Sequence, residues 1–352
     1  MSIQKLRMED HRQAKELWKS CFFDSDSFLE VYLKEAANFK NTLAYYKEDE
    51  ILADLFMLKF CAKVSGTSYQ TDFLAGCATR KDARNKGYMR QLVKEALKAM
   101  QKEGMCVTFL HPFLHAFYRK FGYETISYVT RHKQTADAKK MMHKVRRVQK
   151  FEDFPLQKAQ EAYDKMMKKY DNCFLRTPER FSVWIKLLYA DDGEAVMIEH
   201  DGKVSYALYY ETQQEIDIFE LVCQNHDERL SLINYFDKKQ VNYSLPAEAD
   251  DKDGEEFTMM RVINPIPLLK NKIFEDCEFI LHITDDFLQQ TYNLQILSKN
   301  GITTVESTLE QADFSVDIGN FAKIFTGAAN KTTDIEILRL FKRESSCFFE
   351  TY

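Results

Sequence analysis

The chain has 352 residues, of which 45% are hydrophobic and 29% charged, and its formal net charge is −5. A chain of this length is too long for one ordinary hydrophobic core, which predicts two or three domains. The acidic balance argues against general nucleic-acid binding. No stretch approaches the roughly 18 apolar residues of a membrane span, and the first residues, MSIQKLRMEDHRQ, lack the apolar core of a signal peptide. We therefore expect a cytoplasmic protein without a nucleic-acid or membrane partner.

In chain order, apolar periodicity first predicts helices over residues 8–23 and 27–37. Strands over residues 41–46 and 51–64 follow, joined by the acidic turn KEDE. Residues 71–123 then have the pattern of a strand, a basic glycine loop, a helix, a strand and a second helix, followed by an alternating strand to about residue 131. Mixed strands around one central loop, with helices first, indicate an α/β domain that ends near residue 137.

The loop in this segment is strongly basic. Arg80, Lys81, Arg84 and Lys86 surround a single Asp82, and Gly87 closes the loop before a helix that ends at Gly104. The buried stripe of that helix is expected to contain Met89, Leu92, Val93, Ala96, Leu97 and Met100. The first amides of a helix attract phosphate oxygens, so the pattern indicates an anion site. A solvated basic turn before an ordinary surface helix is an equally good interpretation of the loop alone.

A second unit repeats the order of the first. After the basic link AKKMMHKVRR, we expect helices over residues 156–169 and 177–190, strands over 195–199, 204–210 and 216–223, and a helix over 226–238. FELVCQNHDERLSLINYF parallels FLAGCATRKDARNKGYMRQLV, but the acidic HDER, without a glycine, replaces RNKG. We interpret this unit as a structural duplicate without the anion site, rather than as a second active site.

A third unit follows the acidic run EADDKDGEE, which we interpret as a loop or boundary. Strands are expected over residues 279–284, 288–295 and 302–309, and helices over 320–326 and 334–341, the second capped by the threonines before it. The apolar end SSCFFETY indicates a packed tail. The predicted domains are residues 1–137, 138–255 and 256–352.

Two motifs carry a family resemblance. RNKGYM at residues 84–89 resembles the pyrophosphate loop of the Gcn5-related N-acetyltransferase (GNAT) superfamily, with Met89 where a small residue is common. FYRKFGYE resembles the signature of the Eis-type (enhanced intracellular survival) branch, with Lys120 in place of arginine and Glu124 in place of glycine. The resemblance implies an α/β (α+β) chain with tandem GNAT folds and a C-terminal sterol-carrier-protein-like domain whose end returns to the active site.

The same resemblance implies acetyl-CoA as the donor, no metal, and homo-oligomers, hexamers among them. The residues expected to hold the donor are Cys77, Ala78, Thr79, Arg84, Asn85, Lys86, Gly87, Tyr88, Met89, Arg90, Phe113 and Leu114. Tyr118 corresponds to the position of the family's general acid, and the carboxylate of Tyr352 corresponds to its general base. Without the resemblance, we would interpret Tyr118 as a core aromatic residue and Tyr352 as an ordinary chain terminus. His111 corresponds to an active-site position or is a satisfied strand-end histidine, and no His/Asp constellation supports Cys77 as a nucleophile.

The leading hypothesis is an acetyl-CoA-dependent N-acetyltransferase that uses a ternary complex, with an aminoglycoside-like polyamine or a lysine amine as acceptor. An aromatic and acidic wall for a polycation would consist of Phe22, Phe23, Asp24, Asp26 and Phe28. The alternative from another class is a non-catalytic sensor of coenzyme A or of an apolar ligand on a GNAT scaffold. A peptidyl-transfer enzyme that uses aminoacyl-tRNA shares the duplicated layout, but the acidic charge disfavours it.

Overall fold

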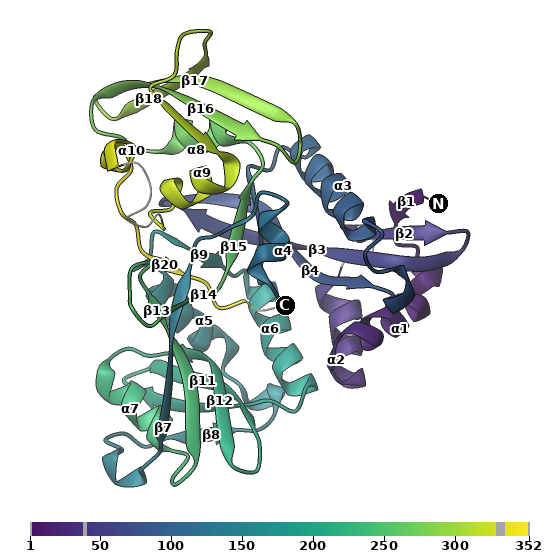
Figure 1. Cartoon of the computed structure of the whole chain (residues 1–352). Coiled ribbons are helices and arrows are strands. Elements are labelled where there is room, and N and C mark those ends of the chain that lie inside the picture. The colour runs from purple at the N-terminus through teal and green to yellow at the C-terminus, as the bar shows by residue number, and fades with distance from the viewer. Residues whose placement is uncertain (1, 38–40, 329–334, 351–352) are drawn as a thin grey trace.

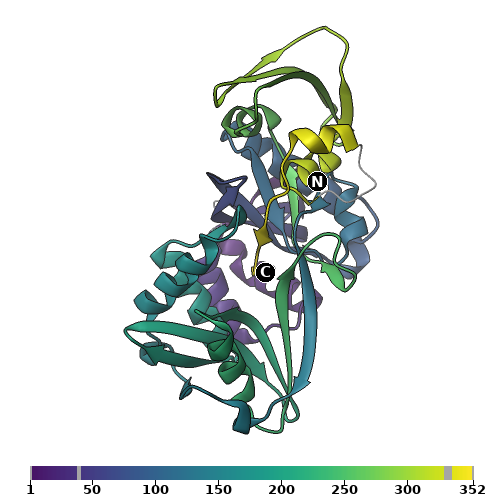
Figure 2. The same cartoon turned by 90° about the vertical axis from the view of Figure 1, so that its left-hand side faces the viewer.

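The computed structural model describes residues 2–37, 41–328 and 335–350, which form three sheets and the helices packed on them (Figure 1). In Figure 1 the third sheet lies at the top, the second at the lower left, and the first crosses the middle and right. The turned view in Figure 2 keeps this vertical order. The α/β fold class expected from the sequence is confirmed.

The first sheet has the strand order β1-β2-β3-β4-β5-β15-β6. These strands are β1 (Ser2–Lys5), β2 (Leu43–Lys47), β3 (Glu50–Val64), β4 (Thr67–Thr79), β5 (Val107–Leu110), β15 (Met259–Val262) and β6 (Glu124–Thr125). Two more strands extend it beside β3, namely β9 (Asn172–Leu175) and β20 (Ser346–Cys347). Helices α1 (His11–Cys21) and α2 (Asp26–Val31), continued by a π-helical turn at Tyr32–Ala36, cover one face. Helix α3 (Tyr88–Lys102) covers the other, and the short α4 (His115–Arg119) follows β5.

A β-bulge in β4 shapes this sheet. Asp54 of β3 lies opposite Ala78 and Phe56 lies opposite Ala75, so that two residues of β4, Gly76 and Cys77, share one partner position. Only glycine fits at the first of them, because its φ is +54° and a Cβ would lie 2.1 Å from Cζ3 of Trp18. β4 pairs with β5 only at Asp72 and Phe73, although it continues to Thr79. Beyond Phe73 this side of β4 has no strand partner among the described residues, and Cys77 and Thr79 of this part line a cavity.

The second sheet has the order β14-β7-β13-β12-β11-β10-β8. The strands are β7 (Tyr128–Thr135), β8 (Arg146–Val148), β10 (Glu194–His200), β11 (Lys203–Glu211), β12 (Glu215–Val222), β13 (Gln240–Ala247) and β14 (Gly254–Glu256). Its helices are α5 (Leu156–Met167), α6 (Pro178–Ala190) and α7 (His226–Asn234).

The first two sheets share one crossover connection. As β4 crosses through α3 to the parallel β5, so β12 crosses through α7 to the parallel β13. A register shift at Phe219 of β12 matches the bulge of β4. At the start of α7, however, the Asn225 side chain accepts a hydrogen bond from the Glu228 amide at 2.9 Å, and Asp227 and Glu228 stand in the first turn. This helix end therefore repels anions, unlike that of α3.

The third sheet has the order β18-β17-β16-β19, with strands β16 (Cys277–Asp285), β17 (Gln290–Lys299), β18 (Ile302–Ser307) and β19 (Phe314–Asp317). Its helices are α8 (Pro265–Asn271), α9 (Ile318–Phe325) and α10 (Ile335–Leu340). Short 3-10 turns lie at Met8–Asp10, Lys81–Ala83, Ala138–Lys140 and Phe151–Asp153. The threonines expected to cap the last helix lie outside the described residues.

Several segments cross between the sheets. β6 ends in the first sheet, and β7, two residues later, belongs to the second. β15, expected to open the third unit, pairs with β5 and β6 in the first sheet. Among the helices that the structure describes, none has the length and apolar character needed to cross a membrane.

Candidate active site

A cavity of about 700 Å³ lies where α1, the bulged strand β4, the basic loop, α3 and α4 meet. Its lining residues are Cys21, Phe22, Cys77, Thr79, Ala83, Arg84, Asn85, Gly87, Tyr88, Met89, Arg90, Phe113, Leu114, Phe117, Tyr118 and Phe121. Most of these side chains are apolar or aromatic, and the polar groups gather at the loop. This combination suits a ligand with an anionic end and a long apolar or amide arm.

The loop turns sharply because two of its residues adopt left-handed backbone conformations. Asn85 has φ 62° and Gly87 has φ 79°. Gly87 is also the N-cap of α3, where no side chain caps the helix, so its first amides remain available to an incoming anion. A Cβ at Gly87 would meet nothing within 4 Å. The space in front of the helix start is therefore open.

The loop cations have different surroundings. Arg80 is neutralised by Asp82 at 2.7 Å and by Glu50 at 3.0 Å. Arg84 lines the cavity and donates from Nε to the Thr79 carbonyl at 3.2 Å. The Arg90 guanidinium lies 4.8 Å from the centre of the Phe287 ring. Arg84 of the loop and Arg90 in the first turn of α3 thus both lie at the cavity wall.

Tyr118 lies on α4 between the rings of Phe117 and Tyr123, with only 4% of its surface exposed. Burial, with a contribution from the neighbouring Cys77 thiol, raises the pKa of Tyr118 well above its usual value. The hydroxyl is therefore protonated in the neutral range and can donate a proton. Burial also raises the pKa of Cys77 to about 12, which disfavours the nucleophilic thiolate.

The structure brings most of the expected donor-site residues to this one cavity. Those that line it are Cys77, Thr79, Arg84, Asn85, Gly87, Tyr88, Met89, Arg90, Phe113 and Leu114, together with the expected acid Tyr118. Ala78 faces the α1 core and Lys86 is exposed, so neither side chain lines the cavity. Met89 packs into the α3 core with 8% exposure and also contributes to the cavity wall. Tyr352 lies outside the described residues.

Some lining residues were not expected in the donor site. Phe117 and Phe121 belong to the FYRKFGYE motif and could have been found from their helical spacing around Tyr118. Cys21, at the end of α1, and Ala83 gave no such signal. Phe22, expected in an acceptor wall, also lines the cavity.

The other members of that acceptor wall are dispersed. Asp26 pairs with Lys15 and Lys19, at 3.1 and 3.0 Å. Phe28 is buried in the core, and Phe23 is fully exposed. Asp24 accepts a hydrogen bond from Nε1 of Trp18 at 2.7 Å, and burial raises its pKa.

His111 is largely buried, and its Nδ1 has no hydrogen-bond partner. Burial, with smaller effects of His115 and Arg131, lowers the pKa of His111 to about 4. The imidazole is therefore neutral at physiological pH. Its ring packs 4.5 Å from that of Phe257, which favours a structural histidine.

The C-terminal segment enters the interior between the first two sheets. β20 pairs with β9, and the Phe348 ring packs 4.7 Å from Phe174 and 5.6 Å from Phe109. Glu350, the last described residue, is fully buried and accepts a hydrogen bond from Nε of Arg176 at 2.7 Å. Figure 1 shows β20 in the middle of the molecule. The expectation of a packed tail is confirmed as far as this residue.

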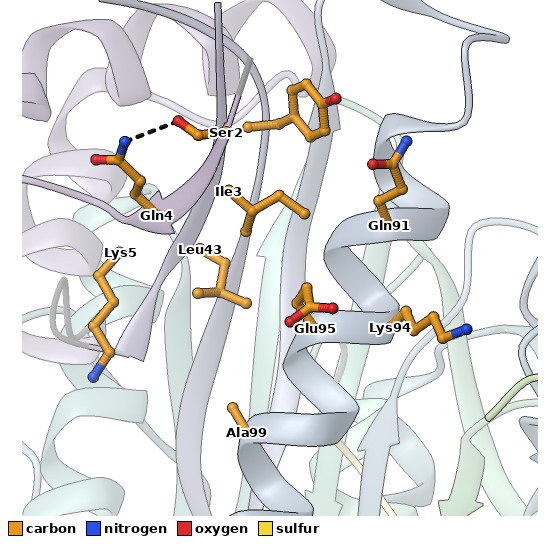
Figure 3. Close-up of a pocket in the computed structure, with 10 residues that line it drawn as sticks. Ser2, Ile3, Gln4, Lys5, Leu43, Gln91, Lys94, Glu95 and Ala99 are labelled. Carbon is orange, nitrogen blue, oxygen red and sulfur yellow. Dashed lines mark hydrogen bonds between the residues drawn. The ribbon is translucent and has the colours of Figure 1, made fainter. Parts of the chain in front are cut away.

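A second hollow, of about 520 Å³, lies between β1, β2 and α3 (Figure 3). Its wall combines apolar residues such as Ile3 and Leu43 with the polar side chains of Gln91, Lys94 and Glu95. Figure 3 shows these polar groups spread along α3 rather than converging on one point. This hollow holds no arrangement suited to catalysis.

Comparison with known proteins gives this geometry a context. Residues 2–126 match the acetyltransferase (GNAT) domain family. No curated protein matches the sequence. A probable N-acyltransferase from Enterococcus faecalis is 14% identical, with a TM-score of 0.81 and coverage of 100% of this chain and 99% of that one.

Two other solved structures have the same fold over their full length. A GCN5-related N-acetyltransferase from Anabaena variabilis is 17% identical, with a TM-score of 0.80 and full coverage of both chains. Eis1 from Mycobacterium abscessus is 14% identical, with a TM-score of 0.73 and coverage of 100% of this chain and 99% of that one. Residues 2–126 therefore match an acetyltransferase (GNAT) domain, and the whole chain shares the fold of these solved structures.

Proposed function

We propose that the protein transfers an acetyl group from acetyl-CoA to the amine of an acceptor, by direct attack in a ternary complex. The observation that supports this most strongly is the meeting of an open helix start, a bulged strand edge and a buried tyrosine in one cavity of about 700 Å³. The helix start would hold the donor's phosphates, with Arg84 and Arg90 beside it. The cavity beside the bulged part of β4 would admit its arm.

In this proposal Tyr118 is the general acid. Acetyl transfer releases a thiolate, which needs a proton as the carbon–sulfur bond breaks. The Tyr118 hydroxyl, which burial keeps protonated in the free enzyme, is the group in this cavity that we assign to supply it. The acceptor amine must lose a proton as well, and we assign the role of general base, which takes up this proton, to the terminal carboxylate of Tyr352. The support for this second role is the burial of the tail up to Glu350 and its anchoring by Arg176.

The domain division stays a prediction: a catalytic GNAT unit, a GNAT-like copy and a sterol-carrier-protein-like unit. Support for the copy comes from the shared crossover of β4–α3–β5 and β12–α7–β13. The acceptor class, an aminoglycoside-like polyamine or a lysine amine, and the homo-oligomeric state belong to the same proposal.

A thiol-release assay over a panel of amines tests the activity itself. We expect free thiol to appear only when acetyl-CoA and an accepting amine are both present. Acetyl-CoA that binds tightly but is not turned over with any amine would instead favour a sensor and overturn the proposed function.

Extension of the chain beyond Tyr352 by a short tag should lower kcat by about 100-fold, because the terminal carboxylate would become an amide that accepts no proton. Steady-state kinetics of the tagged protein measure the effect. The same tag placed before the exposed residue Ser2 is the control and should leave kcat unchanged. A fully active C-terminally tagged enzyme would exclude Tyr352 as the base.

Replacement of Gly87 by alanine should weaken acetyl-CoA binding by about tenfold, since the left-handed conformation costs an alanine about 1–2 kcal/mol and the helix start must shift to relieve it. Isothermal titration calorimetry gives the Kd. Gly104, at the other end of α3, has the same φ of +79° and equally open surroundings, so Gly104→Ala is a matched control. Equal Kd values for the two variants would mean that the loop does not hold the donor.

A further inference from the structure

Asp54 is a buried carboxyl group without a hydrogen-bond partner. It lies in the middle of β3 with 1% of its surface exposed, and neither of its carboxylate oxygens has a partner. Burial raises the pKa of Asp54 well above its usual value. An unpaired buried carboxyl group destabilises a fold, so its presence in a strand core calls for a reason outside packing.

The position of Asp54 relates it to the cavity. Its partner across the sheet is Ala78, and the residues on either side of Ala78, Cys77 and Thr79, both line the cavity. Because side chains alternate along a strand, Asp54 faces the α1–α2 side, opposite to its neighbours Ala53 and Leu55, which pack in the α3 core. Tyr118 packs in that α3 core as well. Asp54 and Tyr118 therefore flank the bulge of β4 from opposite faces of the sheet.

The surroundings of Asp54 are aromatic. Phe56, two residues further along the same face of β3, packs 5.5 Å from the Trp18 ring and 5.8 Å from the Tyr32 ring. Trp18 and Tyr32 are in turn 4.6 Å apart. Burial raises the pKa of the Tyr32 hydroxyl, and the carboxyl of Asp54 contributes in the same direction, as expected of near neighbours. Aromatic rings around a carboxylate attract an alkylammonium group through cation–π contacts and charge-assisted hydrogen bonds.

We propose that Asp54 receives the ammonium group of the acceptor amine, on the face of β4 opposite to Tyr118. The inference rests on the proposed acetyl transfer and adds to it the residue that holds the acceptor. It explains why a carboxyl group without a partner is kept next to the bulge. The missing partner is the cation of the acceptor, which in the bound state offsets the cost of burial.

The substitution Asp54→Asn separates this role from a structural one, because it keeps the shape but cannot form the carboxylate that would pair with a bound cation. We expect the KM for the amine to rise about tenfold or more, since a charge-assisted contact is lost, while the acetyl-CoA Kd stays within about twofold. The melting temperature of the free protein should stay within a few degrees of the wild type, because a buried neutral carboxyl group is replaced by an amide of nearly the same shape. Lower amine affinity together with unchanged stability is the signature of a binding residue that the fold does not need.

Asp72→Asn is the matched control. Asp72 is as deeply buried in β4, but it is paired with Lys59 at 3.0 Å, away from the cavity. Its replacement should leave the amine KM unchanged. An Asp54→Asn variant with an unchanged amine KM, or one that loses stability or fails to fold, would overturn the inference while leaving wild-type turnover intact. Absence of wild-type turnover with every amine would overturn the proposed function as well.

Discussion

Replacement of Tyr118 by phenylalanine should lower kcat for acetyl transfer by about 100-fold or more, while the Kd for acetyl-CoA changes little. The ring would still fill its place among Phe117, Phe121 and Tyr123, so binding and folding should persist. Only the hydroxyl that protonates the leaving thiolate would be missing. Pre-steady-state and steady-state kinetics with a saturating amine give kcat, and calorimetry gives the Kd.

Tyr123→Phe provides the control for this experiment. Tyr123 is equally buried, its ring centre lies 6.1 Å from that of Tyr118, and it does not line the cavity. Loss of its hydroxyl should leave kcat within about twofold of the wild type. If both variants lose activity to the same extent, the effect comes from the aromatic packing and Tyr118 is not the acid.

Replacement of Arg176 by methionine should lower the free energy of unfolding by about 3–5 kcal/mol, because removal of one partner leaves buried charges without compensation. Arg176 donates to Glu220 at 2.7 and 3.0 Å and to Glu350 at 2.7 Å, and all three side chains are at most 1% exposed. Urea unfolding measures the change. Since Glu350 precedes the terminus by two residues, kcat should fall as well.

Arg147→Met is the comparison. Arg147 also pairs with two glutamates, Glu194 and Glu211, but its side chain is 40% exposed. Exposed pairs contribute little, so this variant should lose less than about 1 kcal/mol. If both variants lost a similar amount of unfolding free energy, the buried ion pairs of Arg176 would not contribute more to stability than exposed ones.

The sequence predicted the elements with strong local signals. The six residues expected on the inner stripe of α3 are all buried, and the helix begins at Tyr88 as expected. The loop before it has the sharp turn that Gly87 indicated. These features depend on apolar periodicity and on the backbone conformations that glycine allows. Both are specified by residues that are close together in the sequence.

Features that depend on distant partners were missed. β13 was not expected, because most of its residues are half-buried and show no alternation. β15 was not recognised as a strand of the first sheet, since its partner β5 lies about 150 residues earlier in the chain. The buried Arg261 within it pairs with Asp285 of β16, which no local pattern could indicate.

Asp54 illustrates the same limit at the site. In the sequence it is one of several charged residues of β3, beside Glu50, Lys59 and Lys63, and nothing marks it as buried without a partner. The basic loop could be predicted because its residues are contiguous. The proposed acceptor position could not, because β3, α1 and α2 come together there only after folding.

The insertion of β15 between β5 and β6 has a consequence for biosynthesis. The sheet that carries the basic loop has a gap until residues 259–262 have left the ribosome, although its other central strands are complete by residue 125. Nascent chains shorter than this expose the edges of β5 and β6, where a chaperone or another chain could pair. Acquisition of the active fold is therefore a late event in translation, and a fragment that ends at residue 137 should be a poor starting point for a minimal enzyme.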